Sequence, residues 1–183
     1  CGRQLREPAD SAMRHEADSL LAEAGVRLNW RLIAENRGDE AFPRVVRVRV
    51  KGNCERVAFE ERRDPFSDPV RLASAHTSGG RFTTNAEIEC DAVARLMSRR
   101  LGKQRRSLLG IALGRLLAHE LYHILARSAV DGREGLGKST ITLKELLSQG
   151  FEFDADEIAR IRQDGEPLHP EGVEELRARR GSP

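Results

Sequence analysis

Apolar residues near the start of the chain recur at the spacing of an α-helix. They follow Asp10 and Ser11, which are good N-cap residues, and they stop before Gly25, a residue that commonly follows a helix end. The pattern predicts a helix between these two signals. Its expected buried face consists of Met13, Ala17, Leu20, Leu21 and Ala24.

Apolar and polar residues then alternate, which is the pattern of a half-buried strand. The alternation is clear in residues 26–32 and again in residues 46–51, so we expect a strand in each. Residues 70–77 and 81–90 flank a Ser-Gly-Gly turn signal and predict a β-hairpin. Residues 55–69, with two prolines and many charges, predict an irregular loop.

The most apolar segment, residues 107–127, again follows helical steps and predicts a central helix. Gly110 and Gly114 lie inside it, where each glycine costs about 1 kcal/mol relative to alanine. This cost indicates that another element packs closely against the helix at these two positions.

Shorter helices are expected on either side of the central one. Asp91 can cap a helix that runs to about residue 100, Thr142 can cap one that ends at Gly150, and a third begins at Asp154. Residues 166–183 form a charged tail that we expect to be loosely ordered. The elements together predict a single α/β (α+β) domain over residues 1–183, with a small twisted sheet.

Composition narrows the classes of function. The chain has 183 residues, 39% of them hydrophobic, and a net charge of only +2, which creates no strong field for nucleic acid or an anionic membrane. Its one basic run, residues 99–106, has no aromatic residues that could stack on bases. The small net charge and the lack of aromatics in this run therefore predict no nucleic-acid partner. Because there is no uncharged apolar stretch of about 18 residues, we also expect no transmembrane segment.

The three cysteines bear on the cellular compartment. Cys1 is followed by glycine, as in a bacterial lipoprotein after cleavage of its signal peptide, and it predicts a lipid anchor as one alternative to an arbitrary start. Cys54 and Cys90 are a candidate disulfide pair if the protein is exported, and small buried residues if it is not. The expected location is secreted or cell-envelope.

The central helix carries the motif His119-Glu120-Leu-Tyr-His123. Residues four apart lie on one face of a helix, so both imidazoles can bind one Zn²⁺ ion. Glu120 is rotated by about 100° from His119, and its carboxylate can take a proton from water activated by the metal. Two histidines and a glutamate are costly to bury without a metal or a cleft, which favours a zinc site over a chance pairing.

The residues themselves leave the third zinc ligand open. Metzincins continue the motif with a glycine and a third histidine, but Ala126 and Ala129 occupy those positions here. The chain also has no methionine where a Met-turn is expected. A glutamate from the next helix is the alternative used by gluzincins, and Glu145 lies at a suitable distance along the chain.

The segment HELYHILARSAVDGREGLGK resembles a family of exported zincin-like proteins of soil bacteria, in which a HELYH or HELGH helix is followed by an HG or HS pair. The resemblance extends from AGVRLNWRL through AHTSGG and EIECDAV to TLKELL, which is most of the chain. It implies a zincin-like fold and a zinc peptidase. The position of the later histidine is held by Asp131, and aspartate can also bind zinc.

Asp131 can reach the site only if the chain leaves the helix early. On an unbroken helix it would lie about 11 to 12 Å beyond His123, so the chain must fold back near Arg127 or Ser128. An Asp-Gly pair is also a common turn, which is the competing interpretation of Asp131. Glu145 is the next candidate; Glu134 and Glu152 are more distant ones.

The sequence therefore predicts a zinc metallopeptidase with a peptide or protein substrate, zinc ligands His119, His123 and Asp131, and Glu120 as the general base. The alternative is a module of the same fold that binds zinc or a partner without catalysis. Tyr122 either donates to a substrate oxyanion or packs in the core, and we favour packing. His76 is expected on an exposed hairpin, and His15 and His169 on the surface.

Overall fold

The computed structural model describes residues 5, 7–35, 41–54, 72–79, 81–97 and 105–164. Cys1, the 55–69 loop, most of the basic run at 99–106, His169 and the 166–183 tail lie outside these residues. The described elements are α1 (Ala9–Ala22), a short 3₁₀ helix (Ile33–Glu35), β1 (Arg47–Lys51), β2 (Ala73–Ser78), β3 (Arg81–Glu89), α2 (Cys90–Met97), α3 (Arg105–Leu125), α4 (Leu143–Leu146) and α5 (Ala155–Asp164).

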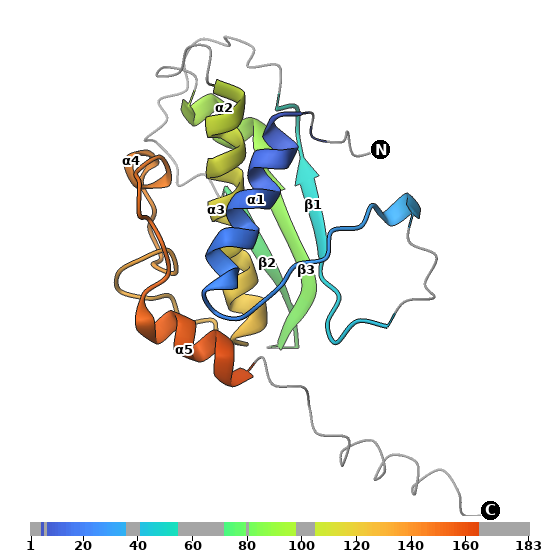
Figure 1. The fold of residues 1–183 in the computed structure, drawn as a ribbon, viewed down its shortest axis with the longest axis vertical. Helices are drawn as coiled ribbons and strands as arrows, with labels where there is room; N and C mark the ends of the chain where they lie inside the picture. The colour runs from blue at the N-terminus through green and yellow to red at the C-terminus, as the bar shows by residue number, and fades with distance from the viewer. Residues whose placement is uncertain are drawn as a thin grey trace, which may run out of the picture.

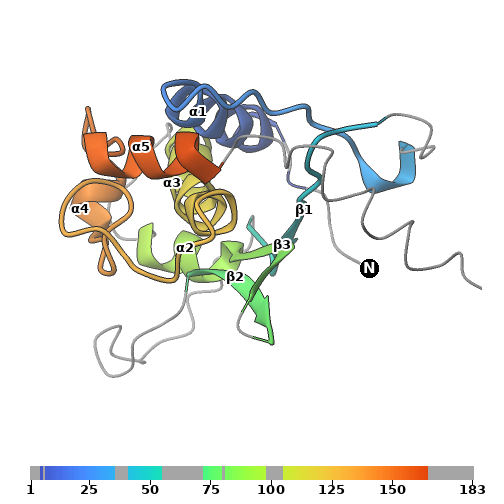
Figure 2. The same ribbon diagram turned by 90° about the horizontal axis from the view of Figure 1, so that it is seen from below.

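The central helix α3 lies between α1 and the sheet, and both views show this layering (Figure 1, Figure 2). The segment that carries α4 and α5 runs along the side of α3 that neither α1 nor the sheet covers. The mixture of helices with a small sheet confirms the predicted α+β class. Because α3 is enclosed on several sides, it supplies more buried hydrophobic side chains, from Leu109 to Ile124, than any other described element.

The sheet has three strands in the order β1-β3-β2. β2 and β3 pair antiparallel as the predicted hairpin, whereas β1 pairs parallel with β3. Side chains alternate between the faces of a strand, so Ala86 and Ile88 of β3 are fully buried toward the helices. Glu87, between them, lies on the outer face and pairs with Lys51 of β1.

The strand predicted for residues 26–32 is wrong. Its side chains do alternate, because Val26, Leu28 and Trp30 are half-buried against the core while Arg27 and Asn29 are exposed. However, the segment forms no ladder with any described strand. An extended chain that lies across a core has the same two-residue period as a strand, so the pattern alone cannot distinguish the two.

The two glycines inside α3 mark a close contact with another element, as predicted, and that element is α1. A Cβ atom on Gly110 would lie 2.5 Å from the Ala9 carbonyl oxygen, and one on Gly114 would lie 2.6 Å from the Met13 carbonyl oxygen. The two helix backbones can therefore approach this closely only where α3 has no side chain. Met13 itself is buried, as are all the α1 residues predicted for this face.

Two of the predicted helix starts are displaced. α1 begins at Ala9 with Pro8 as N-cap, so Asp10 and Ser11 lie inside its first turn and do not cap it. Asp91 likewise lies inside α2. Thr142 caps α4 as predicted, in a capping box with Glu145, although that helix ends at Leu146, well before Gly150.

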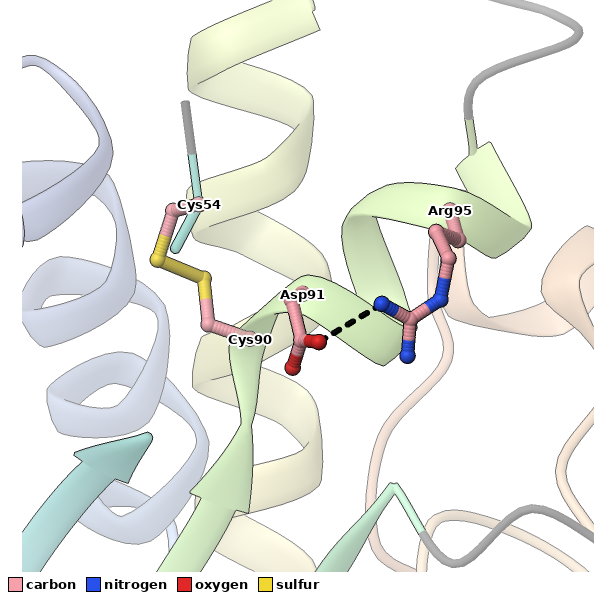
Figure 3. The surroundings of a disulfide bond; sticks show 4 residues. All are labelled: Cys54, Cys90, Asp91 and Arg95. Carbon is pink, nitrogen blue, oxygen red and sulfur yellow. Dashed lines mark hydrogen bonds and ion pairs between the residues drawn. A yellow bond between two sulfur atoms is a disulfide. The ribbon is translucent and has the colours of Figure 1, made fainter. Parts of the chain in front are cut away.

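A disulfide joins Cys54, just after β1, to Cys90, where β3 passes directly into α2 (Figure 3). One residue further, the Asp91 carboxylate accepts a hydrogen bond of 2.6 Å from Arg95 on the next turn. Asp91 also fills the space beside Gly52, where a Cβ atom would lie 2.3 Å from its Oδ1. The end of β1 is therefore attached to the start of α2 by a covalent bond and by close packing.

The stretch Arg106–Leu125 of α3 is long and apolar enough, by length and composition alone, to cross a membrane. The core helix of a soluble protein passes the same test, and 83% of the most apolar part of this stretch is buried inside the protein. Length and composition are therefore weak evidence for a membrane span.

Candidate metal centre

His119 and His123 lie on the last two turns of α3, and their rings converge. The two Nε2 atoms are 3.0 Å apart, and the rings meet edge to face at 81°. The helical spacing of four residues produces this approach, since both side chains leave the same face. His123 is buried, and Phe82 of β3 stacks on its ring with the centroids 5.8 Å apart.

The second nitrogen of each ring is held by a backbone carbonyl. His119 Nδ1 lies 2.9 Å from the carbonyl oxygen of Leu136, and His123 Nδ1 lies 2.7 Å from that of Ser128. A carbonyl can only accept a hydrogen bond, so each Nδ1 must carry the proton. In neutral imidazoles this leaves both Nε2 lone pairs free, and they point at each other.

The end of α3 brings one of these carbonyls back to the helix. Arg127 adopts a left-handed conformation with φ 46°, and Ser128 N–H donates to the carbonyl of His123. This is the bond of a Schellman motif, in which the left-handed position is usually a glycine. The chain thus turns back at Arg127, at the place where the sequence required it to leave the helix.

Asp131 lies beside the two histidines after this turn. Its Oδ1 is 3.2 Å from His123 Nε2, and its side chain is 35% exposed while that of His123 is only 9% exposed. One nitrogen from each histidine and one oxygen of Asp131 all lie within 4.8 Å of one another. In the described part of the chain, these three residues form the group of potential metal ligands.

Burial lowers the pKa of His119 below its ordinary value of 6.5, and the neighbouring His123 ring lowers it further. The hydrogen bond with Leu136 and the charge of Asp131 oppose this shift without cancelling it. His119 is therefore held in the neutral form at neutral pH, and the neutral form is the one that binds a metal ion.

Glu120, the predicted general base, is 7% exposed and lies next to His119 on α3. Tyr122 is completely buried between the rings of His123 and Phe153, and its hydroxyl accepts a hydrogen bond of 3.0 Å from Arg160 of α5. The side chain thus packs in the core, although against Phe153 rather than against the sheet. This placement disfavours its direct contact with a substrate oxyanion.

Glu145, the alternative third ligand, is engaged elsewhere. Its carboxylate pairs with Lys138 and accepts hydrogen bonds from both the hydroxyl and the backbone N–H of Thr142. The hydrogen bond from Lys138, followed by those from Thr142, lowers its pKa to about 2. Glu134 and Glu152 are exposed, and neither belongs to the group formed with the histidines.

The other histidines lie away from this group. His15 is exposed on α1, as expected. His76 of β2 is 45% exposed and pairs with Glu87 at 3.2 Å on the outer face of the sheet, where they line a hollow of about 310 Å³. A second hollow, of about 250 Å³, lies between α1 and the segment after α4. Neither hollow includes His119 or His123.

Comparison of the chain with protein-family models, curated proteins and solved structures found no match. The carbonyls of Ser128 and Leu136 were not predicted, because a backbone acceptor leaves no mark in the sequence. A signal did exist for the loop that carries Leu136, namely the three glycines at positions 132, 135 and 137.

Proposed function

We propose that the protein is a zinc-dependent peptidase with a zincin-like fold, in which His119, His123 and Asp131 hold the zinc and Glu120 is the general base. The observation that carries this proposal is the pair of imidazoles. Their Nε2 atoms are 3.0 Å apart, and both Nδ1 atoms are committed as donors to carbonyls. Two lone pairs at this distance repel each other unless a cation lies between them.

A proton on one Nε2 is the simplest competitor for a metal ion. It would link the two rings by a hydrogen bond, with Asp131 as counter-ion. Burial disfavours a second proton on the His119 ring, which supports the metal over a proton held on that ring. The hydrogen bonds at Nδ1 do so as well, because a metal-binding histidine almost always donates its other N–H to a carbonyl, a carboxylate or water.

The donor set fits zinc. Two imidazole nitrogens and one carboxylate oxygen are typical zinc ligands, and three protein ligands leave a coordination position open, as in catalytic sites. A purely structural site is usually closed by four protein ligands. When bound, zinc would supply a Lewis acid that lowers the pKa of water to about 7.

The chain's own residues provide the remaining chemistry. Glu120 would accept a proton from the attacking water and then deliver it to the leaving amine of the cleaved peptide bond. β2 lies at the edge of the described sheet, and its Thr77 pairs with Phe82, the residue that stacks on His123. An extended peptide that added to this edge would therefore pass close to the histidines.

The disulfide between Cys54 and Cys90 supports an exported protein, since disulfides persist in oxidising compartments and are rare in the cytosol. We propose a secreted or cell-envelope location on this basis. The lipid anchor predicted at Cys1 remains a prediction.

The test is to measure bound zinc per chain, and peptidase activity on a mixed peptide library, for the parent protein and a set of variants. Glu120→Gln should retain zinc and lose activity by about 10²- to 10⁴-fold, the usual contribution of a general base. His123→Ala should lose both, whereas the matched control His15→Ala, which removes an exposed histidine, should lose neither. Zinc retained without activity in the parent would favour the non-catalytic alternative.

A further inference from the structure

The loop of residues 131–137 supplies two groups to the candidate site, the Asp131 carboxylate and the Leu136 carbonyl. Its ends are closed by a hydrogen bond of 2.8 Å from Gly132 N–H to the carbonyl of Gly137. Leu136 N–H donates to the carbonyl of Glu152, which ties the loop to the segment before α5. The positions of the Asp131 carboxylate and the Leu136 carbonyl therefore depend on the contacts that fix this loop.

Glu157 of α5 lies directly against the three glycines of the loop. A Cβ atom added to Gly132 would lie 2.0 Å from Glu157 Oε1, and one added to Gly137 would lie 2.3 Å from the same oxygen. A Cβ atom added to Gly135 would lie 3.1 Å from Glu157 Oε2. The carboxylate thus occupies the space that three side chains would otherwise fill. Gly135 is also left-handed, with φ 66°, but at Gly132 and Gly137 it is this close approach that requires glycine.

The burial of the Glu157 carboxylate is energetically unfavourable. Glu157 is completely buried, and its Oε1 has no hydrogen-bond partner among the described residues. Oε2 accepts a hydrogen bond of 3.0 Å from Asp154 N–H at the start of α5. Burial raises the pKa of Glu157, against the opposing effect of the hydrogen bond from the Asp154 backbone N–H. A cap for α5 alone would not need a carboxylate that reaches into the loop.

We propose that Glu157 is a positioning residue of the metal site, which holds the 131–137 loop so that Asp131 and the Leu136 carbonyl face the two histidines. This inference rests on the proposed function, because Asp131 matters only if the site binds a metal. Glu157 itself belongs to no group of potential ligands in the described chain, so its effect would pass through the loop.

The first test compares Glu157→Gln with Asp156→Asn, a matched loss of one carboxylate from an exposed residue of the same helix. Zinc affinity is measured by competition with a chelator, and folding by circular dichroism. Glu157→Gln should fold and should bind zinc about 10- to 100-fold more weakly than the parent, the usual effect of losing a group that supports a ligand. Asp156→Asn should bind zinc as the parent does.

A second pair of variants tests the steric contact and does not depend on the stability of Glu157→Gln. Gly137→Ala places a methyl group against the carboxylate and should also weaken zinc binding. Glu157→Asp shortens the acid by one methylene, so the double variant should recover part of the affinity that Gly137→Ala loses. A merely structural role predicts lower stability in these variants with zinc affinity unchanged.

The metal-free protein separates this inference from the proposed function. Nitrogen-15 chemical shifts should show His119 fixed with its proton on Nδ1 in the parent, and exchanging between tautomers in Glu157→Gln. Unchanged shifts together with unchanged zinc affinity in Glu157→Gln and Gly137→Ala would overturn the role of Glu157. A parent that binds no zinc would overturn the proposed function, while the shifts would still report whether Glu157 holds Leu136 against His119.

Discussion

His119 and His123 lie on a helix that is packed between α1 and the sheet, whereas Asp131 lies on a loop that is held by one helix end and one buried carboxylate. The histidine pair is determined by helical spacing, and it changes only if the core changes. We infer that the position of Asp131 depends on Arg127 and Glu157, neither of which belongs to the group of potential ligands. The same site thus combines a rigid half and an adjustable half, and single substitutions can separate them.

The largest effect is expected from removal of a ligand in the rigid half. Zinc binding free energies of about 10 to 16 kcal/mol, shared among the ligands of a site, imply roughly 3 to 5 kcal/mol for each ligand, or more than about 100-fold in affinity. His123→Ala should lose at least this much, while Asp131→Ala should lose less because its loop can adapt. Equal losses in chelator competition would remove the distinction between the two halves.

The packing of the rigid half is tested by Gly114→Ala. The added methyl would meet the Met13 backbone at 2.6 Å, and overpacking of this kind costs about 1 to 3 kcal/mol of stability, less the gain of about 1 kcal/mol from replacing a glycine inside a helix by alanine. Urea unfolding of the metal-free protein measures this cost. Ser107→Ala, at an exposed position of the same helix, should change stability by less than about 0.5 kcal/mol. A Gly114→Ala protein that is more stable than the parent would mean that α1 does not pack closely against α3 at this position.

The turn that leads to the adjustable half is tested at Arg127. A left-handed conformation costs a residue other than glycine about 1 to 2 kcal/mol, and glycine loses part of that gain through its greater freedom when unfolded. Arg127→Gly should therefore leave stability unchanged or raise it by up to about 1 kcal/mol, with zinc affinity retained. Arg127→Val should be destabilised, because a β-branched residue tolerates this conformation least. If Arg127→Val were more stable than Arg127→Gly, the left-handed conformation of Arg127 would be contradicted.

The smallest effect concerns Glu145, outside both halves. Its pKa of about 2 in the folded protein lies below the ordinary value of 4.5, so its stabilising contribution is complete above pH 4.5 and is lost as the pH falls towards 2. In Glu145→Gln, the free energy of unfolding should fall less steeply between pH 4.5 and 2 than in the parent. The zinc content at neutral pH should be unchanged. Loss of zinc from this variant at pH 7 would restore Glu145 as the third ligand.

Much of the rigid half could be predicted from the sequence. The position of α3, to within two residues at each end, the close approach of another element at Gly110 and Gly114, and the shared face of His119 and His123 all follow from helical periodicity and local spacing. The signals for these features lie within a few turns of one another on α3, so a single sequence records them directly. The element that packs at the two glycines, α1, is distant in the sequence and was not predicted.

The adjustable half could be predicted only in part, because its determinants are not local. Nothing in the sequence marks Arg127 as left-handed, since glycine is the usual signal. Glu157 contacts the glycines at 132, 135 and 137, which lie at least twenty residues earlier in the chain, and only the structure shows that contact. The false strand at residues 26–32 has a similar cause, because alternation shows which side chains face the core and does not identify a pairing partner.

X-ray absorption at the zinc edge would measure whether His119, His123 and Asp131 bind one metal ion. We expect one zinc per chain, with nitrogen and oxygen neighbours at about 2.0 to 2.2 Å and the outer-shell pattern of two imidazoles. Asp131→Ala should change this shell, and Glu145→Ala should leave it unchanged. A folded parent protein that retains no zinc, or whose zinc has no imidazole neighbours, would contradict a zinc site at His119, His123 and Asp131.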